Sequence, residues 1–301
     1  MQAVYSYHYN KGMSLQAAEN NLFHSIHKSY ELYHLLLMLL VEIHVFAINR
    51  IEIGKNKKLP KPEELNPNTR FIDNLLLHKL SQNQKLNNFI KQTGISWGNN
   101  QEFIKLLYKE ICLSDLYTEY MNTQEGDFEL DKKFIVKLFE KVISKFEPLF
   151  ENLEEQSIFW NDEPELIMSM IIKTLKDYKN NEENNQELMS EYKEDDDKEF
   201  VALLFRKSII NHSEILKLIK KYSVNWDLDR IAFLDVILID IAITEILEFD
   251  KIPIKVTLNE YIEVAKCYST PKSGNFINGI LERIIKHYIQ EGKINKTHIF
   301  A

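Results

Sequence analysis

Apolar residues recur three and four positions apart along most of the chain, which is the period of an α-helix with one buried face. The pattern predicts helices near residues 15–53, 71–90, 101–121, 131–151, 163–178, 198–222, 228–249, 256–268 and 275–290. No stretch of useful length alternates between apolar and polar residues as a half-buried strand does. The predicted fold class is therefore all-α.

The composition supports this prediction. The chain has 301 residues, of which 45% are hydrophobic, but only 8 glycines and 7 prolines. A chain with so few helix breakers and so much apolar side chain can bury a sizeable helical core.

One segment interrupts the helical pattern, at residues 179–198. It is dense in acidic residues and poor in large apolar ones, a composition typical of a mobile linker. We predict an N-terminal helical region at 1–178, an acidic linker at 179–198 and a compact C-terminal helical unit at 199–301.

An apolar stretch at 231–249 has 14 apolar residues in 19, but Asp235, Asp240 and Glu245 interrupt it. Each acid would cost about 2.5–3.5 kcal/mol at the centre of a membrane. The stretch is therefore interpreted as a buried core helix and not as a membrane span. No signal peptide is recognisable, and Cys112 and Cys267 form no disulfide framework, so a cytoplasmic protein is expected.

The net charge is −8, and it is unevenly distributed. Residues 151–200 carry a net charge of −11, whereas residues 251–301 carry +4. A polyanionic partner is thus disfavoured in the middle of the chain and compatible with its end.

No motif of an enzyme is present: the chain lacks GxSxG, a P-loop, GxGxxG and HExxH. His24, His27 and His34 lie on a predicted helix, but no acid or cysteine completes a ligand set at a clear spacing. We therefore expect a protein that is not an enzyme and has no metal or other cofactor.

The stretch TPKSGNFING, residues 270–279, is the chief candidate for chemistry. In one interpretation Ser273 or Asn275 caps a helix and Phe276 packs at its beginning. In the other, the helix amides, Lys272 and Ser273 bind phosphates while Phe276 stacks on a base.

The segment 235–284 resembles the NusB family of transcription antitermination factors. The family pattern there is IP-x-KV-x-x-NE-x-x-E-x-AK, followed by a short loop and KS-x-x-F-[IV]-NG-[IV]-L. The matching residues are Ile252, Pro253, Lys255, Val256, Asn259, Glu260, Glu263, Ala265, Lys266, Ser273, Phe276, Asn278, Gly279 and Leu281. QAVYSYHY at 2–9 is similar to the first helix of the family, and 157–176 is similar to a long form in which a large helical insertion follows that helix.

This resemblance implies a NusB-like helical bundle that binds boxA-type single-stranded RNA of ribosomal RNA leaders together with NusE, a small-subunit ribosomal protein, in the RNA polymerase antitermination complex. The resemblance assigns RNA contacts to Tyr5, Ser273 and Phe276. Lys272 and Asn275, in the same loop and helix start, complete the predicted RNA-binding set.

The chain departs from the family in its N-terminal region, where an arginine-rich segment is expected. Its first 27 residues contain one lysine, Lys11, and no arginine. We expect either that the chain is shortened at this end or that it binds RNA weakly by itself. The alternative function is a helical adaptor that binds proteins and has lost autonomous RNA binding.

Overall fold

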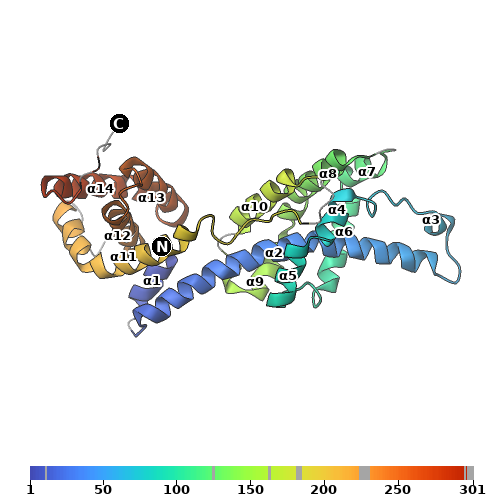
Figure 1. The fold of residues 1–301 in the computed structure, drawn as a ribbon, viewed down its shortest axis with the longest axis horizontal. Helices are drawn as coiled ribbons and strands as arrows, with labels where there is room; N and C mark the ends of the chain where they lie inside the picture. The colour runs from blue at the N-terminus through green and yellow to red at the C-terminus, as the bar shows by residue number, and fades with distance from the viewer. Residues whose placement is uncertain are drawn as a thin grey trace. The chain divides into compact units, whose positions relative to one another are not determined.

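The computed structural model describes residues 1–10, 12–123, 126–161, 164–180, 185–223, 231–294 and 296. Within these residues the regular structure is helical throughout and no strand occurs, which confirms the all-α fold class (Figure 1). The chain divides into two compact units. Unit 1 combines residues 1–24 with 192–301, and unit 2 consists of residues 25–191.

This division differs from the predicted boundaries, because residues 1–24 belong with the C-terminal part of the chain. Helix α1, Gln2–Tyr9, buries Val4 in an apolar cluster with Phe205, Ile237 and Ile241. The cluster joins residues more than two hundred positions apart, so no local pattern in the sequence indicates it.

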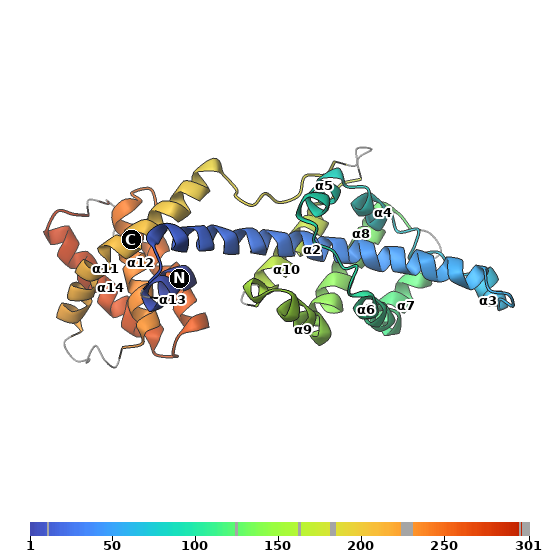
Figure 2. The ribbon, with the colours of Figure 1, turned by 90° about the horizontal axis from the view of Figure 1, so that it is seen from below.

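Unit 2 is built around helix α2, Leu15–Lys55, which gives its first residues to unit 1. Figures 1 and 2 both show the other helices of unit 2 gathered around α2. These elements are α3 (Pro62–Leu65), α4 (Leu75–Ser81), α5 (Gln84–Thr93), α6 (Gln101–Leu113), α7 (Asp115–Met121), α8 (Phe128–Lys141), η1 (Ile143–Lys145), α9 (Glu147–Gln156), η2 (Ile158–Trp160) and α10 (Pro164–Asp177).

Several predicted helices are divided in the structure, because polar side chains cap new helices inside the apolar stripes. Asn74 and Asn83 accept hydrogen bonds from backbone N–H groups and begin α4 and α5 within the predicted helix 71–90. Ser114 does the same for α7 within 101–121. Such a cap satisfies an otherwise unpaired N–H group at a helix start.

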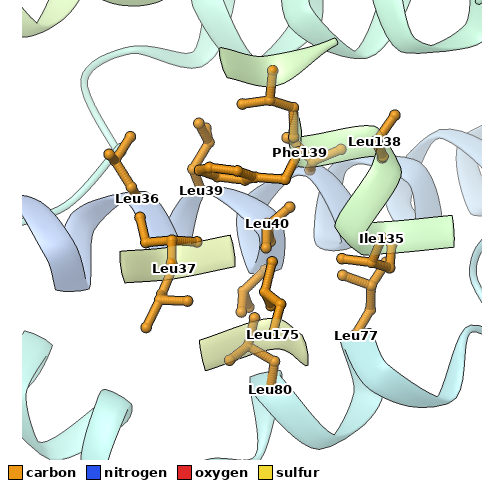
Figure 3. Close-up of a cluster of buried hydrophobic side chains, with 14 of the residues drawn as sticks. Leu36, Leu37, Leu39, Leu40, Leu77, Leu80, Ile135, Leu138, Phe139 and Leu175 are labelled. Atoms are coloured by element: carbon orange, nitrogen blue, oxygen red, sulfur yellow. The ribbon is translucent and has the colours of Figure 1, made fainter. Parts of the chain in front are cut away.

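The core of unit 2 consists of aliphatic side chains of α2 that meet α4, α8 and α10 (Figure 3). Leu39 and Phe139 are fully buried in it, as are Leu77 and Leu175. Part of α2 is long and apolar enough to cross a membrane, with a mean hydropathy of 1.8, but 72% of that segment is buried inside the protein. Burial of this extent is what the core helix of a helical unit requires.

The predicted mobile linker at 179–198 is not a loose connection in its described part. Leu188 and Met189 pack against the core of unit 2. The backbone of Met189 accepts a hydrogen bond from the Tyr30 hydroxyl (3.1 Å) and donates one to the Tyr33 hydroxyl (3.2 Å). Helix α11 then begins at Asp195, within the predicted linker. Residues 181–184 lie outside the described residues.

Unit 1 contains α1, α11 (Asp195–Tyr222), α12 (Phe233–Glu248), α13 (Ile254–Tyr268) and α14 (Ser273–Gln290). Helix α12 lies among α11, α13 and α14 and packs against each of them (Figure 1). Every residue of α12 from 235 to 246 is buried. This confirms the interpretation of the apolar stretch as a core helix.

The acids of α12 are buried with it, and each bonds a different neighbour. Asp235 accepts hydrogen bonds from Ser269 and Ser273, at the two ends of the loop between α13 and α14. Asp240 pairs with His212 of α11, and Glu245 accepts from Thr257 and Tyr261 of α13. Buried carboxylates need such partners, because an unpaired charge in an apolar core is strongly destabilising.

The core of unit 2 leads to a stability prediction. Replacing Leu39, which is 0% exposed, by alanine should lower the free energy of unfolding by about 2–5 kcal/mol, since a buried leucine leaves a cavity. Leu59 is 90% exposed, so Leu59→Ala is the matched control and should change it by less than about 0.5 kcal/mol. Urea denaturation followed by far-UV circular dichroism measures both, and equal losses would contradict the described core.

Candidate nucleic-acid interface

The candidate site lies at the N-terminus of α14, where the chain turns from α13. Ser269 and Ser273 bond opposite oxygens of the Asp235 carboxylate, at 2.6 and 2.8 Å. The backbone N–H of Thr270 donates to the Ser273 hydroxyl at 3.2 Å, which closes the turn. The acid at the start of α12 therefore holds the loop and the first turn of α14 in place.

Ser273 does not face solvent as a phosphate contact would. Its side chain is 1% exposed, and its hydroxyl is occupied by Asp235, Ser269 and Thr270. The described geometry thus ties Ser273 to Asp235 and the turn, and its predicted contact with RNA stays a prediction. Neither Ser273 nor Asn275 caps α14, because Lys272 is the N-cap residue and no side chain bonds the cap.

A pocket of about 570 Å³ opens beside this turn. It gathers Lys272, Ser273, Asn275 and Phe276 of the predicted set, together with Asp235, Thr270 and the apolar residues Ile231 and Ala232. Lys272 and Asn275 are exposed, whereas Phe276 is half-buried and packs partly against the core of unit 1. The pocket thus has a cation, an amide and an aromatic side chain among its lining residues.

Both features that the sequence left open for Phe276, packing at the helix start and access to a neighbouring surface, are present in its geometry. Its side chain packs against the core of unit 1 and also lines the pocket, and whether it stacks on a base is a matter for experiment.

Tyr5 is not part of this pocket. It lies on α1, where its ring stacks with Tyr9 at 6.1 Å and meets Phe233 of α12 at 5.4 Å. Tyr5, Tyr9 and Phe233 are 38%, 73% and 41% exposed, and together they form an aromatic patch on unit 1. Phe233 directly follows Ala232 of the pocket in the sequence.

The sequence analysis did not identify Tyr9 and Phe233. The spacing of Tyr5 and Tyr9 by one helical turn was a visible signal for the first of them. Phe233 gave no signal, because it begins an apolar helix and looks like one more core residue.

Fold and site together define a helical bundle around a buried, acid-bearing helix, with a polar loop and an aromatic side chain at the start of its last helix. The chain belongs to the NusB family. The family model matches residues 166–286. The match begins in α10 and includes the whole pocket, but it does not include α1.

Named relatives agree with this membership. The chain is 41% identical over 100 residues to the transcription antitermination protein NusB of Salinibacter ruber. The aligned part covers 33% of this chain and 62% of that protein. The NusB of Alkaliphilus oremlandii is 37% identical over 99 residues, which is 33% of this chain and 70% of that protein. The NusB of Chloroherpeton thalassium is 41% identical over 100 residues, 33% of this chain and 47% of that protein.

The chain thus spans about half to two thirds of the first two relatives. None of the three names denotes an enzyme. No solved structure gives a significant match.

The role of Ser273 can be tested by stability. Ser273→Ala removes a hydrogen bond to a buried carboxylate and should lower the free energy of unfolding of unit 1 by about 1.5–3 kcal/mol. Ser213 is exposed on α11, and Ser213→Ala should change it by less than about 0.5 kcal/mol. Thermal or urea unfolding checks both, and a Ser273→Ala protein of unchanged stability would argue against the positioning role.

Proposed function

We propose that this protein is a cytoplasmic transcription antitermination factor that binds a boxA-type single-stranded leader RNA together with NusE and so promotes transcription of ribosomal RNA. It acts by binding and catalyses no reaction. Membership in the NusB family and the names of the relatives support the general role. The pocket at the start of α14 carries the proposal of where RNA binds.

Phe276 is the proposed stacking platform. Single-stranded RNA is recognised largely by stacking of its unpaired bases on aromatic rings, since every base has a flat face. Phe276 borders the pocket, and its partial packing in the core holds the ring in a fixed orientation. A ring fixed before binding loses little conformational entropy when a base stacks on it.

Lys272 and Asn275 are the proposed polar contacts. Both are exposed at the first turn of an 18-residue helix, whose N-terminal amides favour anions. Lys272 supplies a mobile positive charge for a phosphate, and the Asn275 amide can pair with a base edge. Asp235 and Ser273 position the turn.

The aromatic patch of Tyr5, Tyr9 and Phe233 extends the proposal to further bases. Its rings are exposed and lie on the unit that carries the pocket.

The chain has few basic side chains on its proposed RNA surface, and we propose that NusE supplies the missing positive charge. Affinity for nucleic acid depends strongly on neutralised phosphates, but the chain has a net charge of −8. One protein with so few cations on its proposed surface binds RNA weakly. A basic partner that binds the same RNA would supply the missing charge, and we therefore expect tight RNA binding only with NusE present.

The adaptor function remains the competing proposal, supported by the low basic content of the N-terminal region. It predicts binding of NusE without any contribution to RNA affinity. Titration of fluorescently labelled boxA-type RNA with NusE, with and without this protein, at two salt concentrations separates the two proposals. Tighter RNA binding in the presence of this protein supports antitermination, and unchanged binding supports the adaptor.

If Phe276 stacks on a base, Phe276→Ala should lower the free energy of RNA binding more than the free energy of unfolding. RNA affinity of the complex with NusE should fall roughly tenfold to a hundredfold, since base stacking contributes about 1–3 kcal/mol. Phe200 is also half-buried in unit 1 but lies outside the pocket, where its ring meets Phe249 at 4.5 Å. Phe200→Ala should leave RNA affinity unchanged, as fluorescence anisotropy measures. A Phe276→Ala protein that melts earlier but binds RNA normally when folded would contradict stacking.

The proposed phosphate contact predicts a change in salt dependence. Removing one such contact lowers the slope of log affinity against log salt concentration by about 0.7 for single strands, for all RNA sequences alike. Lys272→Ala should show this change, whereas Lys217→Ala, at an exposed position of α11, should not. Equal slopes for wild type and both variants would remove Lys272 from the interface.

A further inference from the structure

A second cluster of polar side chains lies inside unit 1, where three helices meet. His8 of α1, His212 of α11 and Asp240 of α12 each present one nitrogen or oxygen atom, and these atoms lie within 4.8 Å of one another. The Nδ1 atom of His212 is 2.7 Å from Asp240 Oδ2, and the ring centroids of His8 and His212 are 4.0 Å apart. Residues separated by up to 232 positions thus converge on one point.

Two atoms of this cluster are buried without a partner. Asp240 is 0% exposed, and its Oδ1 atom has no hydrogen-bond partner among the described residues. The Nε2 atom of His8 is enclosed in the same way. Buried polar atoms of native proteins nearly always have partners, because leaving one unpaired is costly. The two unpaired atoms, Asp240 Oδ1 and His8 Nε2, indicate that the cluster binds a ligand of its own.

Two hydroxyl groups extend the same pattern. Ser208 and Thr244 are each 0% exposed, and in the described part of the chain their oxygen atoms also lack a partner. Ser208 lies one turn before His212 on α11, and Thr244 lies one turn after Asp240 on α12, so each shares a helix face with a cluster residue. Unsatisfied polar atoms therefore gather at these helix faces.

The imidazole of His8 is in the neutral form, which can donate a nitrogen lone pair to a cation. Burial, together with nearby His212, lowers the pKa of His8 to about 4, so its ring is neutral near pH 7. Burial also raises the pKa of Asp240, which the hydrogen bond with His212 opposes. A bound cation would reverse the effect of burial on this carboxyl group.

We propose that His8, His212 and Asp240 bind one divalent transition-metal cation, of which Zn²⁺ is the best fit. Two imidazoles and a carboxylate form a ligand set of zinc sites that keep one position open to water, whereas Mg²⁺ and Ca²⁺ prefer oxygen ligands alone. Ligand atoms about 2.0–2.2 Å from a tetrahedral zinc ion lie roughly 3.3 Å apart. The ligand atoms of the cluster lie within 4.8 Å of one another, so the three side chains draw together when the ion binds. A water molecule completes the fourth position.

The proposed ion has a structural role and makes no contact with RNA itself. Within unit 1, α1 is separated in sequence from α11 and α12 by the whole of unit 2. A cation bound by one residue of each helix fixes α1 to the other two. The same helix carries Tyr5 and Tyr9, so the ion also orders the aromatic patch.

The experiment is a zinc titration of the full-length chain after treatment with a chelator, followed by calorimetry and by the melting temperature. We expect one tight site per chain and a melting temperature that rises with Zn²⁺, since a ligand that binds the folded state stabilises it. Co²⁺ should give the visible absorption of a tetrahedral complex with nitrogen and oxygen ligands. Loss of an outer partner typically lowers metal affinity by 10–100-fold, so loss of a ligand in His8→Ala should lower it at least about a hundredfold.

His287 provides the matched control, because it also lies in unit 1 beside a carboxylate, with Nε2 3.2 Å from Glu291 Oε1, but belongs to no three-residue cluster among the described residues. His287→Ala should keep the site. If Asp240→Asn fails to fold, the affinity of His8→Ala for Zn²⁺ tests the proposal instead. His8 lies on α1 and is only half-buried, so its replacement should not prevent folding. No tight site in the wild-type chain, equal affinity in His8→Ala and wild type, or a crystal structure with only a water molecule in the cluster would each overturn the proposal.

Discussion

Unit 1 depends on one requirement, that the carboxylates of a fully buried helix must each find a partner. Helix α12 is enclosed from residue 235 to residue 246, and Asp235, Asp240 and Glu245 are enclosed with it. An apolar helix alone could pack in several rotations about its axis. Three buried acids permit only the rotation in which each meets its donors, because an unpaired buried charge costs far more than a lost apolar contact. One of these acids, Asp235, also lines the pocket beside α14 and bonds both ends of its loop.

Much of the helical architecture could be predicted from the sequence, because helix periodicity and the scarcity of breakers are local signals. The predicted helices of unit 1 end within about five residues of α11 to α14. The divisions at Asn74 and Ser114 were not predicted, since the apolar stripe continues across them while the cap is a single side chain. The acidic segment at 179–198 was predicted to be a mobile linker because of its composition, but its described part is packed or helical. Asp196 and Asp197 suit the first turn of a helix, where the macrodipole favours negative charge, and Met189 is fixed by contacts from α2.

The candidate site was predicted in outline only. The resemblance of residues 235–284 to the family led to the loop and to Phe276, and the structure gathers four of the five predicted residues around one pocket. The sequence alone could not show that Ser273 bonds Asp235, because Asp235 lies 38 positions earlier. The convergence of His8 and His212 was equally invisible, because neither has a ligand partner at helical spacing. Contacts between distant residues form only when the helices pack.

The division of unit 1 in the sequence has a consequence for the order of folding during synthesis. Residues 1–24 leave the ribosome before unit 2, but the helices against which α1 packs belong to 192–301 and leave after it. Unit 2 is contiguous and can fold as soon as residue 191 has emerged, since domains generally fold as units during synthesis. The apolar side of α1, with Val4, must therefore wait unpaired through the synthesis of the whole of unit 2. A chaperone that binds emerging apolar segments would have the whole synthesis of unit 2 in which to bind this helix.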